Sequence, residues 1–123
     1  MKVVETSAAP AAVGPYSQAM ISGNLIFASG QIPLCPKSGE VVGETVSMQA
    51  EQVCKNIKAL LESAGSSIEK VVKCTCFLTD MGDFAAFNEV YSKYFTGKPA
   101  RSTVAVKGLP KAVLVEIEAI AEV

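Results

Sequence analysis

The fold is decided by residues 45–79, which read TVSMQAEQVCKNIKALLESAGSSIEKVVKCTCFLT. The first part has apolar residues at the spacing of one helix face, at Ala50, Val53, Cys54, Ile57, Leu60, Leu61 and Ala64. Thr45 or Ser47 can cap the start of this helix, and Gly65 is placed to end it. Residues 71–79 are rich in strand-forming residues. The stretch therefore predicts a helix followed by a strand.

Toward the C-terminus, the sequence predicts a second helix and two more strands. The helix follows residues 80–83, and its aromatic residues lie at helical spacing, at Phe84, Phe87, Tyr91, Tyr94 and Phe95. We interpret this aromatic stripe as a face that packs on the sheet rather than as a ligand site. Gly97 and Pro99 end the helix. Strands are predicted at residues 102–107 and 113–122.

Toward the N-terminus, the pattern predicts strands joined by loops. A short strand, a loop, a β-hairpin and a second loop are expected at residues 3–6, 7–15, 16–29 and 30–44. Gly23-Asn24 suits the two-residue turn of the hairpin. Residues 1–123 show no repeat or linker and are expected to form one domain. The order of elements predicts an α+β fold, with both helices on one face of a mixed sheet.

The last predicted strand raises the question of what covers the other face of the sheet. Its residues alternate between an apolar set and a mixed set, the latter being Leu114, Glu116, Glu118, Ile120 and Glu122. A face without helices that carries Leu and Ile favours association of several copies of the chain. A moderately polar face exposed to solvent is the alternative.

Composition excludes several classes of site. The chain has no histidine, which excludes catalytic triads with histidine, zinc sites of the HExxH type and haem with a histidine ligand. The four cysteines form no CxxC motif, so we expect no metal and no cofactor. Free, mostly buried thiols and the lack of a leader segment predict a cytoplasmic protein.

Net charge and hydropathy argue against two classes of binding partner, nucleic acids and membranes. The formal net charge is −1, which gives no net attraction to nucleic acid or to an anionic membrane. No apolar run approaches the roughly 18 residues of a membrane helix. We therefore expect neither a nucleic-acid partner nor a membrane partner.

Two residue types point to chemistry on small acids. Arg101 is the sole arginine among 11 basic residues, and its planar fork suits a carboxylate or phosphate, although it can equally form a surface ion pair. Glu116 and Glu118 lie in an apolar strand, where burial would raise the pKa of a carboxyl group and make it a general acid or base. Each can instead be exposed or paired. If the last two strands pair, Arg101 and one carboxylate border the same cleft.

Segments over nearly the whole chain resemble the RidA (YjgF) family of enamine/imine deaminases. They are APAAVGPYSQ (9–18), SGQIP (29–33), PKSGE (36–40), DFAAFNEVY (83–91), PARS (99–102), LPK (109–111) and EIEAIA (116–121). The resemblance implies a chorismate-mutase-like α+β subunit, in which a mixed six-stranded sheet carries two helices on one face. It further implies a homotrimer around a central barrel, with active sites in the clefts between subunits.

The resemblance also implies an activity without metal or cofactor. The family hydrolyses reactive enamines and imines, such as 2-aminoacrylate, 2-iminopropanoate and 2-iminobutanoate, to 2-oxo acids and ammonia. Arg101 matches the arginine that clamps the substrate carboxylate, and Glu116 matches the carboxylate that handles a proton or orients water. Glu118 is then structural and expected to be paired with a cation.

Five further positions match cleft residues of that family. Ser29 and Gly30 match a loop whose backbone contacts the bound acid or its nitrogen. Tyr16 and Asn88 match residues that line the cleft, with Tyr16 reaching across from the neighbouring subunit. Thr103 stands where many members have cysteine, at a position whose backbone carbonyl helps to hold water.

Two other functions remain open. A trimer that does not catalyse but senses small 2-oxo acids, or regulates a partner enzyme, would use the same arginine. A ribonuclease, an activity credited to some relatives, is disfavoured by the net charge of −1, the single arginine and the absence of histidine.

Overall fold

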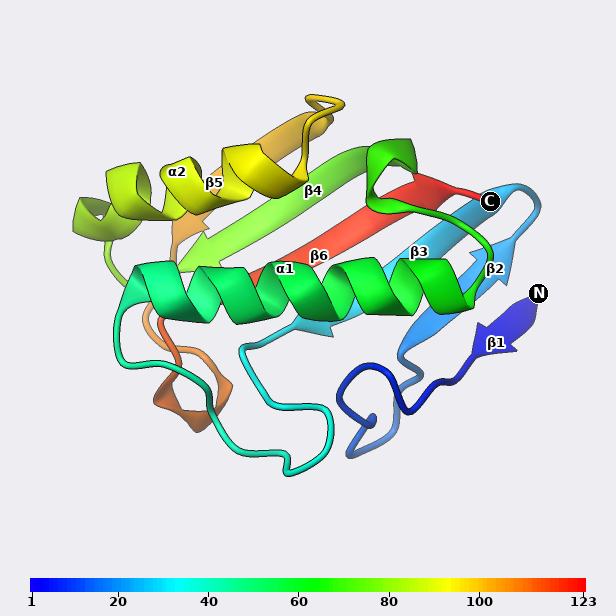
Figure 1. The fold of residues 1–123 in the computed structure, drawn as a ribbon, viewed down its shortest axis with the longest axis horizontal. Coiled ribbons are helices and arrows are strands. Elements are labelled where there is room, and N and C mark those ends of the chain that lie inside the picture. Colours follow the sequence, from blue (N-terminus) through cyan, green and yellow to red (C-terminus); the bar gives the residue numbers. More distant parts are fainter.

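Both α-helices lie on the same face of a single six-stranded sheet, as Figure 1 shows. The structure is a computed structural model and describes all residues, Met1–Val123. The strands are β1 (Lys2–Val4), β2 (Ala19–Ser22), β3 (Leu25–Gln31), β4 (Val71–Leu78), β5 (Ala100–Ala105) and β6 (Val115–Glu122), and the helices are α1 (Val46–Ser63) and α2 (Phe84–Tyr94). Single 3₁₀ turns occur at Ile68–Lys70, Met81–Asp83 and Pro110–Ala112. The predicted α+β layer with a mixed sheet is confirmed.

Helix α1 begins and ends where the capping signals indicate. The Thr45 side chain accepts a hydrogen bond from the Met48 N–H at 3.2 Å, which satisfies one of the free donors at the helix start. Gly65, just beyond the helix end, has φ of +82°, a conformation that favours glycine. The apolar face of α1 is buried, and Ile57 and Leu60 are completely inaccessible to solvent.

The aromatic stripe of α2 packs as predicted at its centre and C-terminal end. Phe87 and Phe95 are buried. Tyr91 stacks on Phe95 with ring centroids 4.4 Å apart, and it lies 5.7 Å from the ring of Phe87. These rings attach α2 to the sheet beside β4 and β5.

The strand order determines whether the last two strands pair. The order is β1-β2-β3-β6-β4-β5, with β6 antiparallel to both β3 and β4. The last two strands, β5 and β6, therefore do not pair, because β4 lies between them. Strand β5 pairs with β4 in parallel, and this arrangement needs the crossover that α2 provides.

The two faces of the sheet differ in burial, as the alternation of apolar and mixed residues in the last strand predicts. Val115 and Ile117 are buried under the helices, whereas Glu116 is half-buried on the opposite face, which we call the open face. Strand register places Phe27 and Val104 on the open face as well, and their side chains remain 44% and 45% exposed. The open face thus keeps apolar side chains that this chain alone does not cover.

Buried amide side chains fix the loops at one end of the sheet. Gln18 donates to the backbone carbonyls of residues 6, 9 and 10. Asn56 of α1 donates to the carbonyls of Ile32 and Leu34. Gln49 donates to the carbonyl of Gly43, and its side-chain oxygen accepts a hydrogen bond from the N–H of Leu114, just before β6. Because these bonds are enclosed, they hold the loops in one arrangement.

The four thiols are free, and three of them are buried. Burial raises the pKa of Cys74 to about 11 and that of Cys76 to about 12, so both are unreactive, as expected. No helix of the chain combines the length and apolar character needed to cross a membrane.

Candidate active site

Arg101 is immobilised by one face of α2. Its Nη1 donates to Asn88 Oδ1 at 2.6 Å, and its guanidinium carbon lies 4.7 Å from the ring centroid of Tyr91 and 5.5 Å from that of Phe84. Residues 84, 88 and 91 lie on the same helix face, at i, i+4 and i+7. The guanidinium plane is therefore held by cation–π contacts while its other N–H groups remain available to a ligand.

Arg101 does not form an ordinary surface ion pair. The single salt bridge in the chain joins Lys58 and Glu62 on exposed α1, with an N–O distance of 2.8 Å. Arg101 is half-buried and faces an amide oxygen rather than a carboxylate. The positive charge is thus fixed in place without an anionic partner, which is the arrangement that a carboxylate ligand requires.

Glu116 is a half-buried carboxylate with a perturbed pKa. Loss of solvation raises its pKa above the ordinary value, and the nearby negative charge of Glu118 raises it further. Glu118 itself is exposed and forms no ion pair, so the expectation that it pairs with a cation is wrong. Its effect on the site is electrostatic, since it disfavours the charged form of Glu116.

Gly30 permits the close approach of Glu116. A Cβ atom at Gly30 would overlap Oε2 of Glu116, so the space beside this backbone is filled by the carboxylate. The register of β3 on β6 shifts between Ala28 and Gln31, which marks a β-bulge. The bulge and the missing side chain together place Glu116 against the Gly30 backbone.

Ser29 and Tyr16 lie on the same side of the molecule as Gly30. The Ser29 hydroxyl donates to the Ser17 carbonyl at 2.6 Å, and the Ser29 N–H donates to the Gln18 carbonyl at 2.9 Å. Ser29 therefore ties β3 to the preceding loop. Tyr16 is 54% exposed and lines the same recess as Gly30, and its hydroxyl accepts from the Val13 N–H at 3.4 Å.

Thr103 lies on the same side of the sheet as Arg101, two residues further along β5. It aligns with Cys76 of β4, and its hydroxyl is buried without a hydrogen-bond partner. The Tyr91 hydroxyl is buried and unpartnered in the same way. Each of these hydroxyl groups lies beside a buried thiol, that of Tyr91 beside Cys74 and that of Thr103 beside Cys76.

The chain alone does not bring Arg101 and Glu116 together. Arg101 aligns with Cys74 of β4, and Cys74 aligns with Ala119 of β6, so all three side chains face the helices. Glu116 lies an odd number of residues from Ala119 and faces the opposite way. The condition for a shared cleft within one chain, pairing of the last two strands, is therefore not met. The site residues form two groups. The first group is Arg101, Asn88 and Thr103. The second, which we call the Glu116 group, is Glu116, Gly30, Ser29 and Tyr16.

Phe84 and Tyr91 are site residues that the sequence analysis assigned to packing alone. Their rings do belong to the aromatic stripe, but both contact the guanidinium of Arg101. The signal that identifies them is their spacing from Asn88, which places all three residues on one face of α2.

The family described as "Endoribonuclease L-PSP" matches residues 6–123 of the chain. The chain is 56% identical to "Putative regulator AldR" of Lactococcus lactis, over 100% of this chain and 98% of that protein. It is 47% identical to "Putative reactive intermediate deaminase TdcF" of Escherichia coli, over 98% of this chain and 95% of that protein.

Solved structures show the same relationship. The crystal structure of a putative endoribonuclease from Thermotoga maritima superposes with a TM-score of 0.97 at 52% identity, covering 100% of this chain and 98% of that one. Escherichia coli TdcF with bound serine superposes with a TM-score of 0.94 at 46% identity, covering 100% and 99%. Since sequence and fold match over the full length, the chain belongs to the Endoribonuclease L-PSP family, which includes the YjgF and RidA proteins.

Proposed function

We propose that the chain deaminates reactive enamines and imines by hydrolysis, releasing 2-oxo acids and ammonia. The observation that carries this proposal is Arg101, the sole guanidinium of the chain, which is held by α2 without any carboxylate partner. The deaminase name of TdcF and the serine bound in its crystal structure support the proposal, because serine carries the same α-carboxylate. Substrates such as 2-iminopropanoate and 2-iminobutanoate present that carboxylate next to the C=N bond.

The proposed chemistry needs one anion clamp and one proton-transfer group. Arg101 holds the α-carboxylate of the substrate, and the enamine becomes the imine as its carbon gains a proton and its nitrogen loses one. Water then adds to the imine carbon, with Glu116 accepting a proton from the water and returning one to nitrogen. The C–N bond of the resulting carbinolamine breaks, ammonia leaves and the 2-oxo acid remains. General acid–base catalysis of this kind contributes roughly 10²–10⁴-fold.

The proposed site is completed by a second copy of the chain. Within one chain, Arg101 and Glu116 face opposite sides of the sheet, so a neighbouring copy must bring its Glu116 group to Arg101. Association through the open face, where Phe27 and Val104 are exposed, would cover apolar surface at the same time. We therefore propose a homotrimer with sites between subunits, in which Tyr16 enters the site together with Glu116.

A mixing experiment tests both the residues and the shared site. Arg101→Ala and Glu116→Gln are each expected to lose at least 100-fold in the rate of clearing 2-aminoacrylate generated by a dehydratase. Subunits of the two variants are then dissociated, mixed in equal amounts and reassociated. In random trimers, about one quarter of the sites contain both natural residues, so activity returns to about one quarter of the parent level.

The control for the mixing experiment is each variant dissociated and reassociated alone, which must stay inactive. If Arg101→Ala clears the intermediate as fast as the parent, the clamp role is wrong. If the mixture stays as inactive as its components, the two residues do not act across an interface.

A non-catalytic sensor of small 2-oxo acids is the second candidate, and the regulator name of AldR favours it. The Glu116→Gln variant separates the two functions. A sensor would bind 2-oxobutyrate and keep its full physiological effect in this variant, whereas a deaminase would lose its effect with its activity.

The remaining parts of the proposal concern partners and compartment. We propose no nucleic-acid substrate, since the chain carries a net charge of −1 and offers a single arginine to phosphate groups. Free thiols persist in reducing compartments, so four free cysteines support a cytosolic location.

A further inference from the structure

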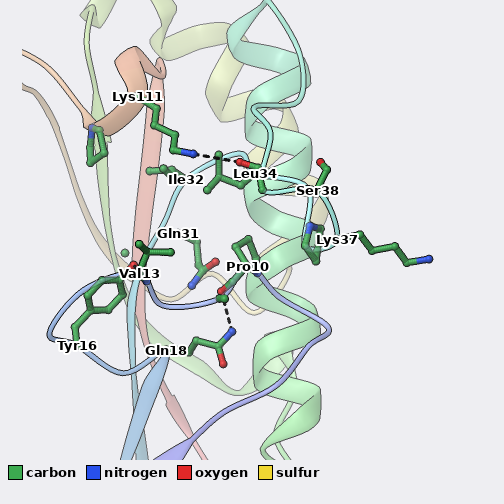
Figure 2. A pocket seen from close by; sticks show the side chains of 15 residues that line it. Pro10, Val13, Tyr16, Gln18, Gln31, Ile32, Leu34, Lys37, Ser38 and Lys111 are labelled. Carbon is green, nitrogen blue, oxygen red and sulfur yellow. Dashed lines mark hydrogen bonds between the residues drawn. The ribbon is translucent and has the colours of Figure 1, made fainter.

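A recess of about 460 Å³ opens next to Gly30, at the end of the sheet where the loops gather (Figure 2). Tyr16 and Gly30 belong to the Glu116 group of the proposed site and also line this recess. The recess continues past them between the loop at Pro10, the loop at Leu34 and the 3₁₀ turn that contains Lys111. Space therefore extends from the proposed reaction site into a pocket that the mechanism above does not use.

Gln31 lines this recess with an unsatisfied side chain. The chain has four buried amide side chains, and those of Gln18, Gln49 and Asn56 are all hydrogen bonded. Gln31 as a residue is 5% exposed, and its amide forms no hydrogen bond within the chain, but its polar atoms are not sealed from solvent. Figure 2 shows this amide in the middle of the recess, between Pro10 and Val13. Because these amide atoms reach the recess and form no hydrogen bond within the chain, they are free to bind a polar ligand.

The charged side chains in the lining of the recess are lysines, and the Glu116 carboxylate lies beside Gly30 at its edge. Lys37 and Lys111 are among its lining residues, and no acidic residue is. Lys111 donates from Nζ to the Gly39 carbonyl at 3.2 Å, which uses one of its three donors and directs the ammonium across the recess. The ammonium of Lys37 points away from it (Figure 2).

The backbone at Lys111 and Ala112 is in a strained conformation. Lys111 and Ala112 both have positive φ, +56° and +55°, although neither is glycine. Such left-handed residues are strained and persist where the surrounding structure imposes the conformation. The strain accompanies a lysine that is held over a pocket, which is consistent with a role in binding.

We propose that this recess binds a carboxylate group, with the Lys111 ammonium and the Gln31 amide N–H as its donors. The inference rests on the proposed function. Its ligand would be the second carboxylate of an imino acid derived from a dicarboxylic amino acid. The α-carboxylate of that substrate is held by Arg101, and its side chain runs past Gly30 and Tyr16 into the recess. The same chemistry would accept a separate small carboxylic acid, and the experiment distinguishes the two sources.

Binding of product acids by calorimetry tests the proposal without relying on catalysis. 2-Oxoglutarate, which has two carboxylates, is expected to bind the parent protein at least tenfold more tightly than 2-oxobutyrate, which has one. Gln31→Leu and Lys111→Gln should each reduce this preference to less than threefold while leaving 2-oxobutyrate binding unchanged. Lys37→Gln is the matched control, since it removes the same charge from a side chain that points away, and it should keep the full preference. Lys111 is exposed, so its variant tests the proposal even if Gln31→Leu folds poorly.

Equal affinity for the two acids in the parent protein would overturn the proposal, as would loss of the preference in Lys37→Gln alone. Glutarate, which lacks the oxo group, identifies the source of the carboxylate. If glutarate binds undiminished while 2-oxobutyrate saturates the protein, the recess takes a separate acid; if it is displaced, the recess serves the substrate. Failure of the proposed function is seen separately, as 2-oxobutyrate binding that survives Arg101→Ala.

Discussion

The environment of Arg101 distinguishes a guanidinium from any other cation. Two aromatic rings lie against its planar group, and Asn88 accepts from one edge of the fork. A lysine ammonium is a point charge that neither stacks as a plane nor offers two parallel donors to a carboxylate. The site therefore depends on the shape of the side chain as well as on its charge.

The Arg101→Lys variant should consequently keep its fold and lose affinity for substrate. We expect KM for 2-aminoacrylate to rise by about 30-fold or more, which corresponds to the loss of one charge-assisted hydrogen bond, while kcat changes less. Steady-state kinetics measures the two constants. An unchanged KM would show that the carboxylate does not bind at Arg101.

Gly30 is predicted to be essential because the absence of a side chain leaves room for the Glu116 carboxylate. Its backbone does not need a conformation that favours glycine. In Gly30→Ala the new Cβ displaces the Glu116 carboxylate, which can swing away because it ends a flexible side chain. Stability should change little, but the deaminase rate should fall by about 100-fold, as expected when a proton-transfer group is displaced. Gly108→Ala is the matched control, since nothing lies within 4 Å of its Cβ position. Full activity in Gly30→Ala would contradict the assigned role of Glu116.

The raised pKa of Glu116 has a defined effect on stability. Because the folded state holds the Glu116 proton more tightly than the unfolded chain does, this carboxyl stabilises the fold at acid pH, and that contribution is lost as pH rises through its raised pKa. Glu116→Gln should therefore be more stable than the parent at pH 7, by less than about 1 kcal/mol since the group is half-buried. Thermal unfolding of both proteins at pH 4 and pH 7 measures this. A larger advantage of the variant at pH 4 would reverse the sign and contradict the prediction.

At the scale of the elements, most of the secondary structure follows from local sequence. The periodicity of residues 50–64 and the caps at Thr45 and Gly65 determine α1, and its first turn extends four residues before the periodic pattern. The hairpin at Gly23-Asn24 forms as predicted, with β2 and β3 paired from Ser22 and Leu25. These features are local in sequence, so a single sequence contains the information that specifies them.

The N-cap of α1 gives a prediction at this scale. Thr45→Ala removes the acceptor for the Met48 N–H and should cost about 1 kcal/mol of unfolding free energy. Thr45→Ser keeps the hydroxyl and should restore most of that loss. Urea unfolding of the three proteins measures the difference, and equal midpoints would show that the cap contributes nothing.

At the scale of the whole molecule, sequence patterns are much less informative. The position of β6 between β3 and β4 depends on pairing between distant segments, and no pattern within residues 113–122 specifies it. The same lack of information left open whether Arg101 and Glu116 lie on one face of a single chain. The residue types of the site were identifiable from the sequence, whereas the face on which each lies required the strand order. Gln31 stood within the recognised SGQIP segment, but only its place in the lining of the recess marks it as a candidate binding residue.

The open face leads to a prediction about assembly. Val104→Glu places a charge among apolar side chains on that face and should shift the protein toward smaller species in sedimentation velocity, with loss of deaminase activity. Val123→Glu, at an exposed C-terminal residue, is the control and should leave both unchanged. An active monomer in Val104→Glu would show that one chain carries a complete site.

The central position of β6 also determines when the protein can fold during its synthesis. Residues 115–122 are translated after the other five strands, yet they supply the inner hydrogen-bonding partner of both β3 and β4. Until they emerge, the nascent chain holds two sheet fragments with unpaired inner edges, which are prone to aggregation. The sheet is therefore completed only once β6 has emerged, and a premature stop codon before β6 leaves two sheet fragments that no strand joins.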